Sequence, residues 1–217
     1  MPERRVLIAL ALITIAASIA GIETTLAPRA RSVLNMLSMG IVVSTIFYFI
    51  VVWVPGQQRK ARIHRSLQEH YSAFRSSCVH TFLIASNSQD YHPKEMLLDP
   101  SEFRRYFKVE VGNGQNRWHV VLNALNGNRY LLRDIQYELE ILREELLYVL
   151  NFIDIHDEEV FAFLKRLAQI IYRMRDIETG YDDIKQIGGL LWEIFAGWNV
   201  INGYRDKDII QSMIDRV

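Results

Sequence analysis

Residues 33–54 read VLNMLSMGIVVSTIFYFIVVWV, twenty-two residues without a charged side chain. An α-helix rises about 1.5 Å per residue, so a stretch of this length crosses the hydrocarbon core of a bilayer, which is about 30 Å thick. Four aromatic residues gather toward its end, at Phe47, Tyr48, Phe49 and Trp53. Because aromatic side chains of this kind lie at the level of the lipid headgroups, the stretch predicts a transmembrane helix.

A second apolar stretch precedes the first. Residues 6–22 read VLIALALITIAASIAGI and are also uncharged. This length lies at the short end of what spans a bilayer, and Arg4 and Arg5 can extend the span by snorkelling. A cleavable signal peptide is the alternative, since Ser18-Ile19-Ala20 resembles a small-x-small cleavage site. We expect a transmembrane hairpin over residues 1–56, with spans at about 6–26 and 33–54.

Basic residues set the expected orientation of this hairpin. The N-terminal tail carries Arg4 and Arg5, and the loop between the apolar stretches carries Arg29 and Arg31. The segment after the second stretch carries four more, Arg59, Lys60, Arg62 and Arg65. The excess of Lys and Arg marks the cytoplasmic side, so we expect both chain ends in the cytoplasm. We call the four residues the basic collar; each attracts anionic lipid by about 1 kcal/mol near a membrane surface.

Small and weakly polar residues interrupt the second apolar stretch. Asn35, Ser38 and Thr45 fall at helical spacing on one face, and Gly40 and Ser44 form a small-xxx-small pair that lets helix backbones approach closely. Two interpretations remain open. These residues either pack the hairpin together, or they line a leak formed when several hairpins oligomerise. Neither stretch contains an acidic or basic side chain, which argues against a proton-coupled transporter or a selective ion channel.

The remainder of the chain, residues 57–217, predicts an all-helical cytoplasmic domain. The pair Pro55-Gly56 is expected to kink the chain at the membrane surface. Apolar residues then recur at helical spacing and predict a bundle of four to six helices with a short final helix at 207–217. The periodic stretches are 63–82, 132–153, 160–177 and 184–201. We expect these stripes to form an intramolecular core rather than an oligomer seam, and the glycines at 188, 189 and 197 to allow close packing.

Charge and cysteine content exclude several classes of protein. Beyond residue 80 there are 16 Lys and Arg against 22 Asp and Glu, a net charge of −6. An acidic body on a basic collar predicts no direct binding of nucleic acid. The single cysteine, Cys78, excludes an internal disulfide and any multi-cysteine metal site, and we expect it to be a small buried hydrophobe.

No motif in the sequence predicts chemistry. A P-loop, GxGxxG, HExxH and GxSxG are absent, and the six histidines lack metal-ligand spacing, so no catalytic residue, metal or cofactor is predicted. Arg75 and His80 match R-x4-H, which resembles the signature of the helical HEPN ribonucleases, although a spacing of five does not place both side chains on one helix face. Three acidic pairs are expected to cap helices, Glu158/Glu159, Asp182/Asp183 and Asp154/Asp157.

The order of features along the chain carries a resemblance. Two apolar stretches, the segment RKARIHR at 59–65 and the apolar periodicity downstream together resemble the two-transmembrane effectors of bacterial anti-phage defence systems, such as the SLATT-type proteins and the membrane effectors of some retrons. The resemblance covers the whole chain at the level of architecture. It implies an inner-membrane protein that oligomerises, disrupts the membrane and arrests growth. It also implies a protein or ribonucleoprotein partner, such as a reverse transcriptase carrying its RNA–DNA product, that keeps the effector silent.

Two other functional classes remain beside the effector. One is a membrane-tethered adaptor that recruits a soluble partner through its helical domain. The other is a membrane-anchored ribonuclease that uses Arg75 and His80. The two residues lie in the helix predicted to lead out of the membrane.

Overall fold

The structure is a computed structural model that describes residues 28–87, 93–112, 114–199 and 203–217, with the backbone alone for 28–35 and residue 38. It is 77% helical and 3% strand, which confirms the expected helical class. The chain divides into two compact units, Met1–Ala61 and Arg62–Val217. The predicted span at 6–26 lies outside the described residues, and the predicted division after Gly56 stays a prediction.

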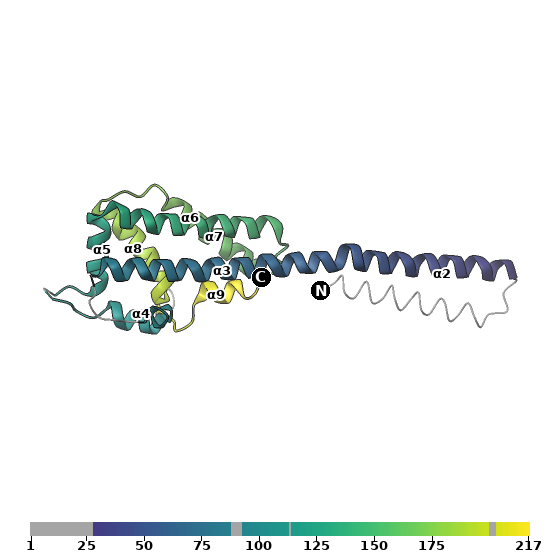
Figure 1. Cartoon of the computed structure of the whole chain (residues 1–217), viewed down its shortest axis with the longest axis horizontal. Helices are drawn as coiled ribbons and strands as arrows, with labels where there is room; N and C mark the ends of the chain where they lie inside the picture. The colour runs from purple at the N-terminus through teal and green to yellow at the C-terminus, as the bar shows by residue number, and fades with distance from the viewer. Residues whose placement is uncertain (1–27, 88–92, 113, 200–202) are drawn as a thin grey trace. The chain divides into compact units, whose positions relative to one another are not determined.

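The first unit contains the long apolar helix (Figure 1). Helix α2 covers Pro28–Tyr48, a π-helical segment η1 covers Phe49–Trp53, and helix α3 covers Val54–Ala85. Residues Met39–Ala85 form one helix of 47 residues, which is long and apolar enough to cross a membrane, and no residue of its most apolar window is buried. The helix predicted at 33–54 is therefore present, with an exposed apolar surface.

The expected effect of Pro55-Gly56 is wrong in its position. The chain stays helical across the pair, which lies in the first turn of α3, and the irregularity is the π-helical segment just before it. A proline in a helix interior lacks an N–H and clashes with the carbonyl four residues earlier. Widening the preceding turn to π geometry relieves this conflict and keeps the helix continuous.

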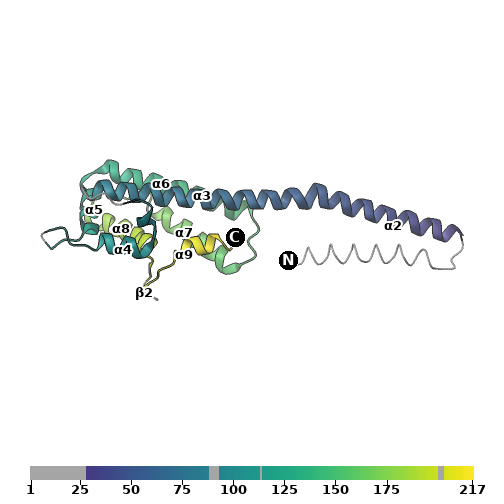
Figure 2. The same ribbon diagram turned by 60° about the horizontal axis from the view of Figure 1, so that its bottom comes forward.

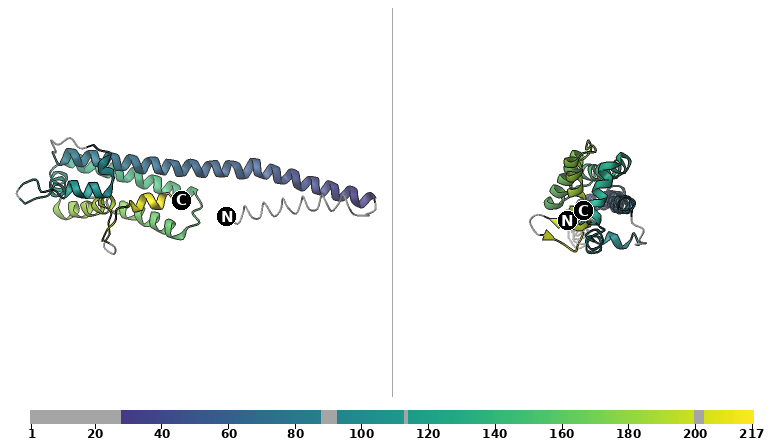
Figure 3. Two further views of the ribbon diagram at one scale, coloured as in Figure 1. Left: turned by 90° about the horizontal axis from the view of Figure 1, so that it is seen from below. Right: turned by 90° about the vertical axis from the view of Figure 1, so that its left-hand side faces the viewer.

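The second unit contains the rest of α3 and the remaining elements (Figures 1 and 2). In chain order they are η2 (Met96–Leu98), α4 (Pro100–Phe107), α5 (Arg117–Gly127), α6 (Arg129–Phe152), α7 (Glu158–Arg173), α8 (Tyr181–Ala196), β1 (Trp198–Asn199), β2 (Gly203–Tyr204) and α9 (Ile209–Ile214). Helix α6 lies beside α3, since His70 of α3 is 3.9 Å from Glu145 of α6 (Figure 3).

The core of this unit is built from the predicted apolar stripes. In α3 the stripe comprises Ile63, Leu67, Tyr71, Phe74, Cys78 and Phe82, and in α6 it comprises Leu132, Ile135, Leu139, Leu142, Leu146 and Val149; all of these side chains are buried. The stripes are thus intramolecular core, as expected. An aromatic cluster that the sequence pattern did not predict joins α3, α4, α5 and α8: the ring of Phe82 lies 5.3 Å from Trp118 and 5.2 Å from Phe195, centre to centre.

The helix expected over 184–201 ends earlier than predicted. Helix α8 stops at Ala196 because Gly197 has φ +62°, a left-handed conformation that favours glycine. A Cβ atom at Gly197 would lie 2.5 Å from the carbonyl oxygen of Arg205. The chain after it forms an antiparallel ribbon in which Trp198 pairs with Tyr204 and Asn199 with Gly203. This small ribbon is the departure from the expected all-α fold.

Candidate functional site

The weakly polar face of the apolar helix is the first candidate region. Thr45 Oγ1 donates a hydrogen bond to the carbonyl oxygen of Ile41 at 2.8 Å, so its hydroxyl is satisfied within its own helix. Ser44 is exposed, and no described atom lies within 4 Å of the place that a Cβ of Gly40 would occupy. The side chains of Asn35 and Ser38 lie outside the described residues. Among the described residues, no side chain covers the Gly40–Ser44 face.

The basic collar lies on α3 directly after this helix. Arg59, Arg62 and Arg65 are exposed, and Lys60 is half-buried. At spacings of three residues, the three arginines occupy one side of the helix, roughly 120° wide. Ile63, at the middle of the collar, is the first buried residue of α3. The collar thus presents exposed cations between the apolar helix and the packed domain, which suits contact with anionic headgroups.

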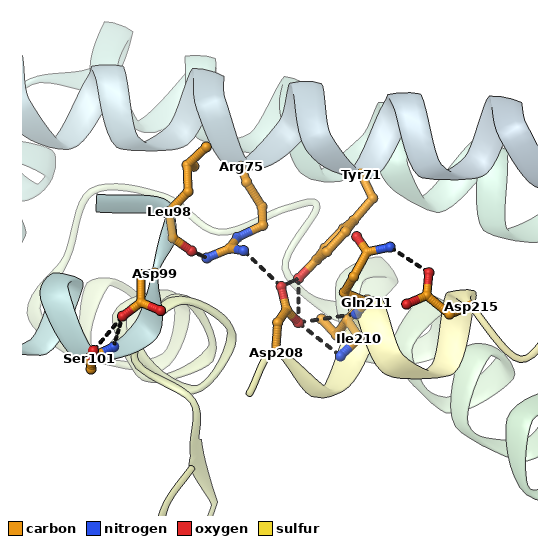
Figure 4. Close-up of polar contacts among 9 residues, drawn as sticks. All are labelled: Tyr71, Arg75, Leu98, Asp99, Ser101, Asp208, Ile210, Gln211 and Asp215. Carbon is orange, nitrogen blue, oxygen red and sulfur yellow. Dashed lines mark hydrogen bonds and ion pairs between the residues drawn. The ribbon is translucent and has the colours of Figure 1, made fainter. Parts of the chain in front are cut away.

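The most developed polar site in the described chain is buried between α3, α9 and the residues before α4 (Figure 4). Arg75 Nη1 lies 2.8 Å from Oδ2 of Asp208, and the exposed fraction of each side chain is 11%. The hydroxyl of Tyr71 donates to the same carboxylate at 2.8 Å. Arg75 Nη2 donates to the carbonyl of Leu98. We call Tyr71, Arg75 and Asp208 the Arg75 cluster.

Asp208 also begins the last helix. Its Oδ1 accepts hydrogen bonds from the backbone N–H of Ile210 at 2.9 Å and of Gln211 at 3.1 Å, the pattern of an N-cap. One carboxylate therefore caps α9 and neutralises a guanidinium on α3. On the other side, Leu98 precedes Asp99, whose side chain caps α4. The Arg75 cluster thus fixes the starts of two helices to the middle of α3.

A row of polar contacts continues from this cluster toward the start of the domain. Gln68 Nε2 donates to Asp215 Oδ1 at 3.1 Å, and His64 Nε2 lies 3.0 Å from the carbonyl oxygen of Ile214. His64, Gln68, Tyr71 and Arg75 follow one another by three or four residues, so they share one face of α3. The C-terminal helix is therefore held to α3 by polar bonds along three turns.

Burial determines how this cluster behaves electrostatically. Desolvation raises the pKa of Tyr71 well above its usual value, and the negative charge of Asp208 raises it further, so the phenol remains a donor. Within the described chain, Arg75 Nε is a buried atom without a hydrogen-bond partner. Removing one member of a buried ion pair leaves the other charge uncompensated, at a cost of about 3–5 kcal/mol. Each charge of the pair therefore depends on the presence of the other.

The two side chains of the R-x4-H pair are not brought together within their helix. Arg75 is buried and bonded to Asp208, whereas His80 is exposed on another face of α3. The described residues contain no group of three or more His, Cys, Asp or Glu side chains placed to hold a metal ion.

Of the three acidic pairs expected to cap helices, one supplies a cap through Asp157, whereas α8 begins at Gly180 without a side-chain cap. Asp157 caps α7 through the N–H groups of Glu159 and Val160, and its hydrogen bond from Arg216 holds its pKa below the usual value. Asp183 accepts from the N–H of Glu178 at 3.1 Å. Asp157 thus caps a helix, whereas Asp183 ties the loop before α8 to the first turn of that helix.

The sequence contained a signal for the Arg75 cluster that the motif search missed. Arg75 falls on the stripe of Tyr71, Phe74 and Cys78, all buried. A cation on a buried face requires a buried counter-charge, and its partner lies 133 residues away at Asp208.

Comparison of the chain with protein-family models, curated proteins and solved structures finds no match.

Proposed function

We propose that this protein is a non-enzymatic membrane effector. Residues 1–56 form a transmembrane hairpin in the bacterial inner membrane, both chain ends lie in the cytoplasm, and the helical domain is restrained by a protein or ribonucleoprotein partner. When the partner releases the domain, hairpins of several copies assemble and breach the membrane. The proposed role is growth arrest in anti-phage defence, as the architectural resemblance implies.

One observation carries this proposal. Residues 39–85 form a single helix in which the apolar part is exposed and the later part supplies the buried face of the helical domain. Exposed apolar surface on this scale is unfavourable in water, at about 25 cal/mol per Å², and favourable in lipid. A partner that binds the helical domain therefore acts on the helix that also carries the apolar part.

The Arg75 cluster has a defined part in this proposal. It joins α3 to the start of α9. A partner that binds the helical domain is therefore connected to α3 through the polar bonds of the cluster. The basic collar holds the same helix at the membrane surface through anionic headgroups. The weakly polar face at Asn35, Ser38 and Thr45 and the small-residue face at Gly40 and Ser44, on the opposite side of the helix, provide the contacts between hairpins.

The first experiment measures membrane potential in cells induced to express the full chain. The comparison is residues 57–217, which keep the compact unit that begins at Arg62 and lack both apolar stretches. We expect depolarisation and growth arrest with the full chain and neither with the shorter one. Growth arrest without depolarisation would overturn the pore mechanism, and arrest by the shorter chain would move the activity to the helical domain.

A second experiment separates the effector from an adaptor. Asn35, Ser38 and Thr45 are changed together to leucine, which keeps the span apolar and removes its weakly polar face. The matched control changes Met36, Met39 and Val43 of the same helix to leucine. The first triple variant should abolish depolarisation and the second should retain it. An adaptor would tolerate both variants, because its only requirement is attachment to the membrane.

A further inference from the structure

A cavity of about 520 Å³ lies between α7, α8, the β1–β2 ribbon and α9. Its lining is mostly apolar, and four of the apolar side chains that line it are only half-buried: Phe163, Ile170, Trp198 and Ile209. We call it the α7–α9 cavity. Ligand-binding pockets have volumes of about 300–1,000 Å³ and combine an apolar lining with a few polar groups. The α7–α9 cavity has the size and the apolar character of such a pocket.

Helix α9, one wall of this cavity, is held at both of its ends. At its start, Asp208 forms the ion pair with Arg75 of α3 at 2.8 Å (Figure 4). Just after its end, Arg216 Nη2 lies 2.8 Å from Oε2 of Glu159 of α7. Because both attachments are made within the protein, the cavity exists before a ligand enters it.

Three basic side chains line the cavity beside the apolar ones: Arg166 of α7, and Arg205 and Lys207 of the segment before α9. Among the described residues, none of these three side chains has an ion-pair partner. The carboxylates next to them in the sequence are already paired, Asp206 with Arg104 at 2.6 Å and Asp208 with Arg75. The three cations of the cavity therefore lack a counter-charge within the described chain.

The carboxylates of the lining do not supply this counter-charge. Glu159 is offset by Arg216. Glu193 is exposed, and partial desolvation raises its pKa. The three basic side chains against Glu193 leave the lining with a net charge of +2, whereas the chain beyond residue 80 has a net charge of −6. A local excess of positive charge in an acidic domain attracts an anion.

We infer that the α7–α9 cavity binds a single-chain amphiphile with an anionic head, such as a long-chain carboxylate. The chain lies among the apolar side chains, where each buried methylene tightens binding roughly fourfold. The head is held by Arg166, Arg205 and Lys207, because charged donors of this kind bind carboxylate and phosphate oxygens strongly. The site goes beyond the proposed function, which assigns no small molecule to the helical domain.

The volume of the cavity favours such a ligand over a helix of another protein. An α-helix with its side chains is about 10–12 Å wide and rises 5.4 Å per turn, so one turn alone occupies roughly 500 Å³. The cavity would admit a single turn, which provides far less contact than a stable protein interface requires. A hydrocarbon chain is thinner and places more of its length in the same volume.

Photo-cross-linking of the full chain in washed membranes tests the site. The probe is a palmitate analogue with a diazirine near the end of its chain, and mass spectrometry of the digested protein identifies the labelled residues. We expect labels on residues of α7, α8 and α9 that line the cavity, and competition by unmodified palmitate. The apolar helix at 39–53 contacts lipid in the proposed function, so its labelling is the internal reference.

Neutral variants show whether the basic side chains hold the head group. Arg166→Gln, Arg205→Gln and Lys207→Gln together should reduce labelling of the cavity roughly tenfold or more, because charged hydrogen bonds to the head are lost. Labelling of the apolar helix should not change. Undiminished labelling of the cavity in this triple variant would overturn the assignment of an anionic head.

A matched triple variant controls for the loss of positive charge. Lys165→Gln, Arg173→Gln and Lys185→Gln change exposed cations of α7 and α8 that do not line the cavity. This variant should be labelled like the parent chain. An equal loss of labelling would mean that the overall charge of the domain, rather than the cavity, attracts the probe.

A filled cavity provides a test that leaves every charge in place. Ala162→Trp puts a large side chain at an exposed position that lines the cavity and should reduce labelling of the cavity at least severalfold. Gln169→Trp, at an exposed position of the same helix outside the cavity, is the matched control and should have no effect.

Two further probes define the chemistry of the ligand. The alcohol of the same chain length should label the cavity roughly tenfold less than the carboxylate, and equal labelling would overturn the anionic class. A diacyl anionic phospholipid with the same diazirine distinguishes a membrane lipid from a single-chain amphiphile. Label in the cavity from the phospholipid and none from the carboxylate would overturn the single-chain ligand.

This inference and the proposed function fail in different ways. Label in the apolar helix and none in the cavity would overturn the inference and leave the membrane span standing. Label in the cavity and none in the apolar helix would support the inference and count against the membrane effector.

Discussion

The apolar helix and α6 both contain many large apolar residues, but these residues are arranged differently around the two helices. Between Met36 and Val52, large apolar side chains point in all directions and are exposed. In α6 the buried apolar residues form one stripe, and the exposed side of the helix mixes apolar and charged residues. Burial in a protein core needs a single apolar face, whereas lipid surrounds a helix. Apolar residues on all sides therefore indicate a membrane solvent, and a stripe indicates a protein neighbour.

Polar groups in the two regions follow the same distinction. Thr45 satisfies its hydroxyl through the carbonyl four residues earlier in its own helix, which requires no tertiary partner. Arg75 obtains its bonds from Asp208 and from the Leu98 carbonyl, both distant in the sequence. Thr45 thus needs no partner outside its own helix, which suits lipid, whereas Arg75 depends on the tertiary fold.

The largest effect is expected from charges in the apolar helix. Val43→Asp with Ile46→Asp puts two carboxylates near the middle of the expected span, at a cost of about 5–7 kcal/mol for insertion. In a chain beginning at Pro28, the double variant should move from the membrane pellet to the supernatant on alkaline extraction. Val43→Leu with Ile46→Leu should remain in the pellet. Full retention of the double aspartate variant would show that this helix is not held by lipid.

The Arg75 cluster should dominate the stability of the helical domain. Arg75→Ala leaves Asp208 buried without its cation and should lower the free energy of unfolding by about 3–5 kcal/mol. Urea unfolding of residues 57–217, followed by tryptophan fluorescence, measures the loss. Arg62→Ala, at an exposed position of the same helix, should change stability by less than about 0.5 kcal/mol.

A double variant shows whether the loss comes from the unpaired charge. Arg75→Met with Asp208→Asn removes both charges and should be less destabilised than Arg75→Ala alone, because no isolated ion remains. Equal losses in the single and double variants would mean that the packing of the arginine stem, rather than the ion pair, stabilises the site.

One matched pair of isoleucines compares the two regions directly. Ile135 is fully buried in α6, and Ile46 is 53% exposed in the apolar helix. Ile135→Ala should lower the free energy of unfolding of the helical domain by about 2–5 kcal/mol, through lost burial and the cavity that remains. Ile46→Ala should leave it unchanged. Thermal unfolding of the full chain in detergent measures both, and a loss on Ile46→Ala would reveal a protein contact in the apolar helix.

Local patterns allowed much of the fold to be predicted. The exposed apolar helix and the stripes of α3 and α6 depend on residues a few positions apart, so their periodicity specifies them. The cap at Asp157 depends on the N–H groups of the next three residues and was equally accessible. The π-helical segment before Pro55 and the end of α8 at Gly197 required backbone geometry that periodicity does not contain.

The candidate site could be predicted far less well. For the Arg75 cluster, the sequence showed only that a cation falls on a stripe of buried residues. It did not show the partner, because tertiary folding brings Asp208 to Arg75. The exposed apolar residues of α6, such as Tyr130 and Ile141, gave no pattern as strong as that of Leu132 and its heptad partners on the other face. Helix periodicity shows that a face is apolar, and the fold is needed to show which face remains exposed.

Two consecutive glycines of α8 contrast a covered face of a helix with an open one. Gly188 and Gly189 both lie inside α8, so replacing either with alanine brings the same gain in helix propensity, about 0.5–1 kcal/mol. A Cβ at Gly188 would lie 2.5 Å from Cδ2 of Leu122, whereas none of the described atoms lies within 4 Å of one at Gly189. Gly189→Ala should therefore stabilise the domain. Gly188→Ala should be less stable than Gly189→Ala by about 1 kcal/mol, which is the lower end of the cost of overpacking. The cost is low because Leu122 is only half-buried and can shift. In a Leu122→Ala background the two alanine variants should become equal in urea unfolding; a difference that persists there would place the cost in the backbone of α8 rather than in its contact with α5.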